Sequence, residues 1–177
     1  DGVYGASIPA AASTPGQLVR YYVVATDTAA RASRWPLFED SLGSPEYLGT
    51  VVVNPAVTSQ LGIWEWFALD TAAARTTTGT RGAVFYNGVL YDNIVIRRRG
   101  AATTQGQKFD FNPGFRITLS PELSNLDEVN INNEAQDPSF IRPPMAWETF
   151  RVAGNPACVS FNLLLRVNGA ADRVGIF

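Results

Sequence analysis

The chain contains a single lysine, Lys108, among 14 basic residues, and all the others are arginines. A lysine ammonium is a compact point charge that commonly contacts phosphate, whereas a guanidinium is a planar fork. The sequence is strongly biased toward arginine, yet it keeps one lysine after a stretch of small residues. This bias indicates that the position of Lys108 requires an ammonium group. We therefore expect Lys108 to contact a phosphate group. The alternative is an ordinary solvated lysine, because charged residues are mostly exposed.

Two strands joined by a loop are expected to position Lys108. Ile94 and Ile96 point to one side of residues 93–98, which have the alternation of a half-buried strand. Residues 100–106 contain no apolar side chain larger than alanine, which indicates a flexible loop. Lys108 then lies at the start of the second strand.

Three consecutive arginines precede this loop. The alternation of the first strand places Arg97 and Arg99 on one face and Arg98 on the other. The three guanidinium groups therefore form either a phosphate-binding cluster or part of a solvated face.

Other strands are indicated by alternation and by turn residues. Residues 63–70 place Trp64 and Trp66 on the same side, and we expect both of them, together with Trp147, to lie in the core. Pairs of residues that favour positive φ predict tight turns between apolar strands at Asn87-Gly88 and Asn168-Gly169.

One helix is expected at about residues 143–153, after a separate turn at 138–141. Ile141, Met145 and Thr149 recur at helical spacing, and a glycine follows the predicted last turn. The order of strands, one helix and further strands indicates an α+β fold, mostly β, with antiparallel strands and the helix packed on the sheet.

The chain divides into two predicted units. Residues 1–36, including a strand at about 3–9, are typical of the closing strands of an immunoglobulin-like or fibronectin-like sandwich. Residues 37–48 are a polar linker with glycine and proline, and residues 49–177 form the second unit. Both ends of the chain have strand-like sequences, so we expect it to be a segment of a longer polypeptide.

Composition excludes several classes of function. A hydrophobic content of 46% and a charged content of 17% are those of a folded domain. The net charge of -2 argues against nucleic-acid binding, and no apolar run is long enough to span a bilayer. Histidine is absent, and Cys158 is the only cysteine, which excludes histidine-dependent catalysis, an intrachain disulfide and a cysteine metal site.

Two long segments resemble the CotH kinase family, named for a spore-coat protein. They are YNGVLYDNIVIRRRGAATTQGQKFDFN and VNINNEAQDPSFIRPPMAWETFRVAGNPACVSFNLLLRVNGAADRVGIF. The family features are a strand ending in R-x-R-G, a lysine opening the next strand, a helix with the pattern D-x-S-x-L-R-x-x-L-A-x-E-x-F, and a later hairpin containing N-G. These motifs occur here in the family order, over about residues 50–177.

The resemblance implies an atypical protein kinase that is secreted or lies at the cell surface. Such a kinase has a mostly β N-lobe with one helix, followed by a helical C-lobe, and uses ATP and a divalent cation to phosphorylate Ser/Thr of a protein substrate. By motif, Lys108 is similar to the phosphate-contacting lysine of the N-lobe, and Arg99 and Gly100 fill the R-G position. Glu148 lies where a kinase places the acid that pairs with this lysine, although a helix acid is usually solvated.

Two departures from the family pattern bear on function. The catalytic and metal-binding aspartates of the family would lie in a C-lobe beyond Phe177. The loop has Thr103 and Thr104 where serine is common. The chain by itself is therefore not expected to catalyse phosphoryl transfer. The alternative function is a non-catalytic structural or adhesive β-rich module, whose partner would belong to an extracellular assembly.

Overall fold

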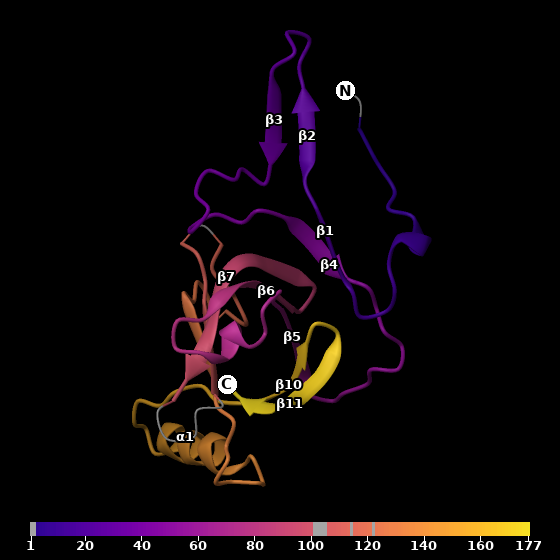
Figure 1. Cartoon of the computed structure of the whole chain (residues 1–177). Helices are drawn as coiled ribbons and strands as arrows, with labels where there is room; N and C mark the ends of the chain where they lie inside the picture. The colour runs from indigo at the N-terminus through magenta and orange to yellow at the C-terminus, as the bar shows by residue number, and fades with distance from the viewer. Residues whose placement is uncertain (1–2, 101–105, 114, 122) are drawn as a thin grey trace.

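A seven-stranded sheet, curled around one core, forms the centre of the computed structural model, which describes residues 3–100, 106–113, 115–121 and 123–177 (Figure 1). The fold is α+β and mostly β, as the sequence predicts. In spatial order the sheet contains β11 (Ala170–Ile176), β10 (Asn162–Val167), β5 (Gly62–Phe67), β6 (Thr80–Tyr86), β7 (Val89–Arg99), β8 (Gly106–Asp110) and β9 (Glu128–Ile131).

The two edges of this sheet meet and close it into a barrel. The amide of Asn132, just after β9, donates to the carbonyl of Ile176 in β11 at 2.8 Å, and the reverse bond is 3.0 Å long. The pairings within the sheet are antiparallel with one exception, because β10 lies parallel to β5. The expected antiparallel pairing holds for the other strand pairs of this sheet and is wrong at this pair.

Large apolar side chains fill the barrel. Trp64 and Trp66 are fully buried, as expected, and so are Ile94 and Ile96 on the inward face of β7. The ring of Trp64 lies 5.2 Å from the ring of Phe109 across the interior. The alternation in the sequence therefore predicted correctly which face of β5 and of β7 is buried.

Both tight turns predicted from the sequence are present. Asn87 and Gly88 connect β6 to β7 with φ of 49° and 81°, and Asn168 and Gly169 connect β10 to β11 with φ of 47° and 79°. These left-handed conformations explain why asparagine and glycine occupy the turns.

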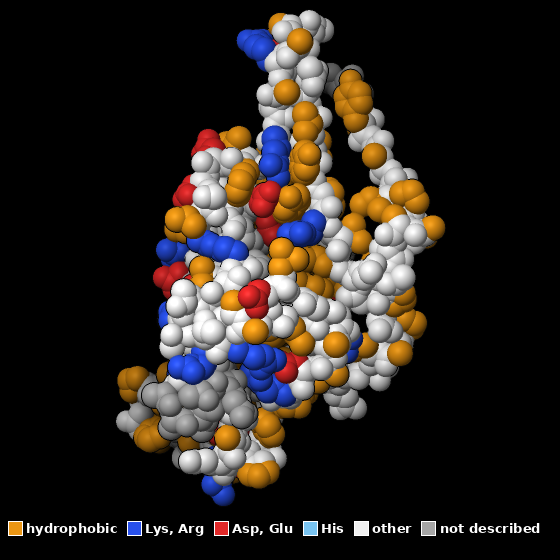
Figure 2. Space-filling view, in the orientation of Figure 1, with side chains coloured by type: hydrophobic (Ala, Val, Ile, Leu, Met, Phe, Trp, Pro, Cys, Tyr) orange, Lys and Arg blue, Asp and Glu red, His pale blue; other side chains and the backbone are white. Residues whose placement is uncertain are grey.

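The N-terminal part adds two small sheets outside the barrel. Strand β1 (Leu18–Tyr21) pairs with β4 (Leu48–Val51), while β2 (Val23–Thr26) and β3 (Ala32–Trp35) form a hairpin that projects from the molecule (Figure 1). Figure 2 shows hydrophobic side chains along this hairpin, and Trp35 is 64% exposed. A short 3₁₀ helix, η1 (Ala10–Ala12), precedes these strands.

Residues 3–9 form no strand, contrary to the expectation, and their side chains are exposed. The pairing of β1 with β4 joins segments from the two sides of the predicted linker. The division into an immunoglobulin-like end and a second unit stays a prediction.

The predicted linker is anchored to β7 by two side chains. The Asp92 carboxylate accepts the backbone amides of Glu46 and Tyr47, each at 2.9 Å. The Asn93 amide donates to the carbonyls of Ser41 and Ser44 at 3.0 and 2.7 Å. The segment before β4 is therefore held on the barrel at one point of β7.

The helix α1 (Arg142–Val152) lies close to its predicted position, but the expectation that it packs on the sheet is wrong. None of its residues is buried, and Trp147 is 37% exposed rather than in the core. At about 100° per residue, Met145 and Val152 lie on one side of the helix while Trp147 and Phe150 lie on the opposite side. The apolar residues therefore form no single face that the sheet can cover.

Candidate functional site

Seven polar side chains lie together on the outward face of β7, β8, β9 and the residue that follows β9. The register places Arg97 opposite Lys108 and Lys108 opposite Asn130, and side chains two residues apart on a strand share a face. We call this set the polar face; it consists of Arg97, Arg99, Lys108, Asp110, Glu128, Asn130 and Asn132. Its three cations exceed its two carboxylates by one charge.

Lys108 is held within this face by two acids. Its ammonium forms ion pairs with Glu128 and, at 3.6 Å, with Asp110, and its side chain is 18% exposed. Arg97 also binds Asp110, at 2.6 Å. The expectation that Lys108 lies in a strand is confirmed, whereas most of the predicted loop, residues 101–105, lies outside the described residues. The role of Lys108 as a phosphate ligand stays a prediction.

The two other residues of the predicted phosphate site lie at the end of β7. The guanidinium of Arg99 donates to the side-chain oxygen of Asn132, and Gly100 follows with a φ of 90°. Thr103 and Thr104 lie outside the described residues. Arg97 and Arg99 share the polar face, as alternation predicts, whereas Arg98 points to the other side of the sheet.

Glu148 lies on the exposed helix and binds a different cation. Its carboxylate accepts from Arg151 Nε at 2.7 Å, and this hydrogen bond lowers the pKa of Glu148. The described ion pairs thus join Glu148 to Arg151, and Lys108 to Asp110 and Glu128. The structure does not bring Lys108 and Glu148 together as a pair.

Sequence reasoning missed both acids that bind Lys108. Asp110 follows Lys108 by two residues on one strand, so strand alternation alone was a sufficient signal for it. Glu128 had no such signal, because its position depends on the register between β8 and β9. A local pattern does not specify that register.

The ion pair between Lys108 and Glu128 predicts a pH-dependent contribution to stability. Hydrogen bonds from Lys108 and Asn130 lower the pKa of Glu128 below its ordinary 4.5. A carboxyl whose pKa is lowered by folding stabilises the protein above its unfolded pKa, and this contribution is lost as the pH falls through the folded value. Lys108→Met is therefore expected to cost about 0.5–1 kcal/mol near pH 6 and almost nothing near pH 2, because the partly exposed pair is screened by solvent.

Urea denaturation of the wild type and Lys108→Met at the two pH values measures this difference. Glu128→Gln is the matched variant, because it removes the titrating carboxyl of the same ion pair. An equal loss of unfolding free energy at both pH values would show that packing of the lysine stem, rather than the ion pair, causes the effect.

The donors of the polar face match phosphate oxygens, whereas a metal ion has no ligand set there. Ammonium, guanidinium and amide N–H groups all donate hydrogen bonds to phosphate. Among the described residues, no group of three or more His, Cys, Asp or Glu side chains is placed to hold a metal ion. The donors of the polar face thus suit the phosphate chain of the expected ATP.

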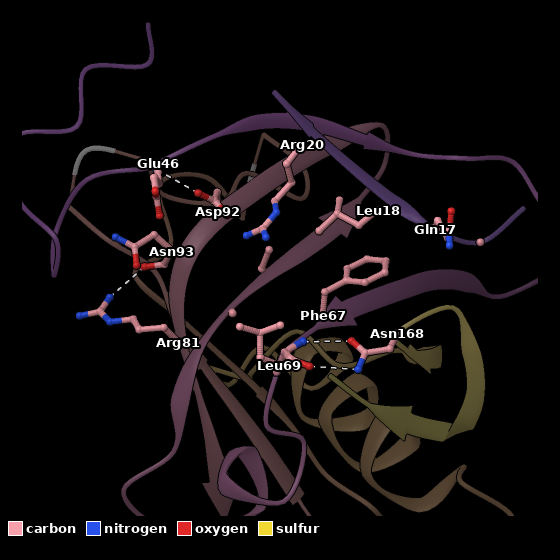
Figure 3. Close-up of a pocket in the computed structure, with 14 residues that line it drawn as sticks. Gln17, Leu18, Arg20, Glu46, Phe67, Leu69, Arg81, Asp92, Asn93 and Asn168 are labelled. Atoms are coloured by element: carbon pink, nitrogen blue, oxygen red, sulfur yellow. Dashed lines mark hydrogen bonds between the residues drawn. The ribbon is translucent and has the colours of Figure 1, made fainter. Parts of the chain in front are cut away.

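A pocket of about 640 Å³ lies elsewhere, between β1 and the part of the barrel formed by β5 to β7 (Figure 3). Most of its polar side chains are already bound to the backbone. Asp92 accepts two amides of the segment before β4, and the Asn168 amide forms two hydrogen bonds of 3.0 Å with the backbone of Ala68. The guanidinium of Arg20 points into the pocket and also lies 4.7 Å from the ring of Tyr47. The polar lining of this pocket mainly joins β1 and its neighbours to the barrel, and none of the predicted site residues lines it.

No helix among the described residues has the length and apolar character needed to cross a membrane. Comparison with known proteins gives no family assignment, because no family model matches the chain and no curated protein has significant similarity to it.

Proposed function

We propose that the chain forms the nucleotide-phosphate-binding N-lobe of a secreted or cell-surface protein kinase similar to the CotH family. In this proposal the polar face contacts the phosphates of ATP, and a protein substrate receives the phosphoryl group on Ser or Thr. The divalent cation would be held by residues of a C-lobe, since the described residues offer no ligand set for it.

The observation that supports the proposal is the position of Lys108. It lies on β8, on the same outward face as Arg97 and Arg99 of β7, at the hairpin whose sequence carries the family motifs. Hydrogen bonds from cations to phosphate oxygens are among the strong polar contacts in proteins. ATP would compete with Asp110 and Glu128 for Lys108, and the excess of positive charge on the face favours the phosphates.

Titration calorimetry with MgATP tests the proposal. Lys108→Ala is expected to weaken binding by about tenfold or more, which corresponds to the loss of one hydrogen bond from a charged group. Lys108→Arg keeps the charge but replaces the compact ammonium by a planar fork, and we expect an intermediate loss. Arg31→Ala is the matched control, because Arg31 is an exposed cation that pairs with Asp27 on the projecting hairpin.

A second function, a non-catalytic structural or adhesive module, is favoured by the exposed apolar side chains. Val23, Val24 and Trp35 on the projecting hairpin, and Met145 and Phe150 on α1, are each at least half exposed. Where exposed apolar side chains form a contiguous patch, the patch commonly marks a contact with another protein. Calorimetry with MgATP also separates the two functions. Wild-type protein that binds no MgATP would overturn the kinase proposal and would leave the structural or adhesive module as the remaining function.

A further inference from the structure

One mouth of the barrel is closed by a short 3₁₀ helix, η2 (Ala73–Arg75). Ala74 is fully buried, and its carbonyl accepts the side-chain amide of Gln107 at 3.0 Å. The carbonyl of Thr76, just after η2, accepts the backbone amide of Arg98 at 2.8 Å. Gln107 and Arg98 lie opposite each other on β8 and β7, so η2 is fixed over the inner face of the hairpin.

Two guanidinium groups meet beside η2, and a third arginine lies opposite Gln107 in the strand register. Arg173 Nη2 lies 3.2 Å from Gln107 Oε1, and its Nη1 lies 3.7 Å from the carboxylate of Asp172. Arg75 approaches the same carboxylate at 3.2 Å, and Arg98 stands opposite Gln107 on the same face of the sheet. Figure 2 shows Lys and Arg side chains gathered beside an acidic one on the lower half of the barrel.

Among the described residues, Arg75, Arg98 and Arg173 outnumber the one acid that two of them bind, Asp172, by two charges. Asp172 is the acid that binds there, and it is shared between Arg75 and Arg173. Desolvation lowers the pKa of Arg173, and the neighbouring charge of Arg75 lowers it further, while Asp172 raises it. Arg98 Nε is buried and has no hydrogen-bond acceptor among the described residues. A buried N–H donor without an acceptor is costly, and an anion that supplies oxygen acceptors would remove this cost.

We propose that Arg75, Arg98 and Arg173 form a binding site for a phosphate group at the mouth of the barrel. A phosphate monoester carries about -1.5 to -2 charges near neutral pH, which matches the excess of positive charge. Its oxygens fit the planar forks of guanidinium groups. The site is separate from the polar face, because Arg98 and Gln107 lie on the opposite side of the same hairpin from Lys108, and it does not depend on the proposed kinase function.

Titration of the protein with inorganic phosphate, followed by calorimetry, tests this site. Arg98→Gln and Arg75→Gln are each expected to weaken binding by about tenfold, as one charge-assisted contact is lost. Arg75 is the safer variant for folding, because 42% of its side chain is exposed. Asp172→Asn keeps a hydrogen-bond acceptor but removes the competing charge, so we expect phosphate to bind about threefold more tightly.

The arginine variants should bind phosphate more weakly and Asp172→Asn more tightly. A poorly folded variant does not gain affinity, so the tighter binding of Asp172→Asn distinguishes a change in the site from a loss of the fold. Arg31→Gln is the control, because Arg31 is an exposed cation outside both proposed sites, and it should bind phosphate like the wild type. Unchanged or weaker binding by Asp172→Asn, or wild-type binding by both arginine variants, would overturn the proposal.

Parallel titrations with MgATP identify the source of the phosphate. Loss of MgATP binding in Lys108→Ala, with phosphate binding unaffected, indicates that the mouth takes a phosphate other than that of the nucleotide. Loss of both ligands in Arg98→Gln, with Lys108→Ala binding both normally, indicates that the nucleotide binds at the mouth and that the role proposed for Lys108 is wrong. Both results support the site at the mouth.

Discussion

Replacing Trp64 by alanine is expected to lower the free energy of unfolding by about 3–5 kcal/mol, the usual cost of truncating a buried aromatic side chain. The Trp64 ring is fully buried and lies 5.2 Å from the rings of both Tyr86 and Phe109, which come from different strands of the barrel. Removing it leaves a cavity that these strands are too constrained to fill. Chemical denaturation followed by circular dichroism measures the loss.

Trp35→Ala provides a matched control for the same chemical change. Trp35 is 64% exposed on the projecting hairpin, so its truncation should cost less than about 0.5 kcal/mol, as for most surface positions. Comparable losses in the two variants would mean that the hairpin carries a packed interface, and that the barrel core alone does not determine stability.

Replacing Asp92 by alanine is expected to cost about 2–4 kcal/mol, because two backbone amides lose their side-chain acceptor at a buried position. Asp92 is 3% exposed, and its Oδ2 accepts from Glu46 and Tyr47. The variant should also release the segment before β4 from the barrel. Limited proteolysis is then expected to cut within residues 37–47 faster than in the wild type, in addition to the loss seen by urea denaturation.

Two further variants refine the Asp92 result. Asp92→Asn retains one side-chain oxygen at the position that both amides use, so it should lose less stability than Asp92→Ala. Glu39→Ala removes an exposed acid from the same segment and should leave both stability and cleavage unchanged. Faster cleavage in Glu39→Ala as well would show that the segment is protected by general packing and not by the two hydrogen bonds to Asp92.

Elements specified by local chemistry were predictable from the sequence. Asn87-Gly88 and Asn168-Gly169 predicted their turns, because few other residue types tolerate both left-handed conformations. Alternation predicted the buried side of β5 and β7. The bounds of α1 followed from helical spacing and a terminal glycine, but its exposure did not, since periodic apolar residues alone do not show what covers them.

Pairings between strands that are distant in the chain could not be predicted from the sequence. Nothing in residues 162–167 indicates that this strand lies parallel to β5, or that Asn132 meets Ile176 to close the sheet. The candidate site shows the same limit. The strand and face of Lys108 were predictable, whereas its ion pair with Glu128 and the approach of Arg173 to Gln107 depend on pairings between distant segments.

The parallel pairing of β5 with β10 has a consequence for how the protein folds. The strands from β6 to β9 and the helix α1 all lie between β5 and β10 in the sequence. The bridge that closes the barrel also cannot form before Ile176 has been synthesised. During synthesis, the hairpins from β6 to β8 can therefore form early, but the Trp64 side of the interior stays open to water until β10 has emerged. Because contacts between such distant segments slow folding, we expect the barrel to close late and as a single step.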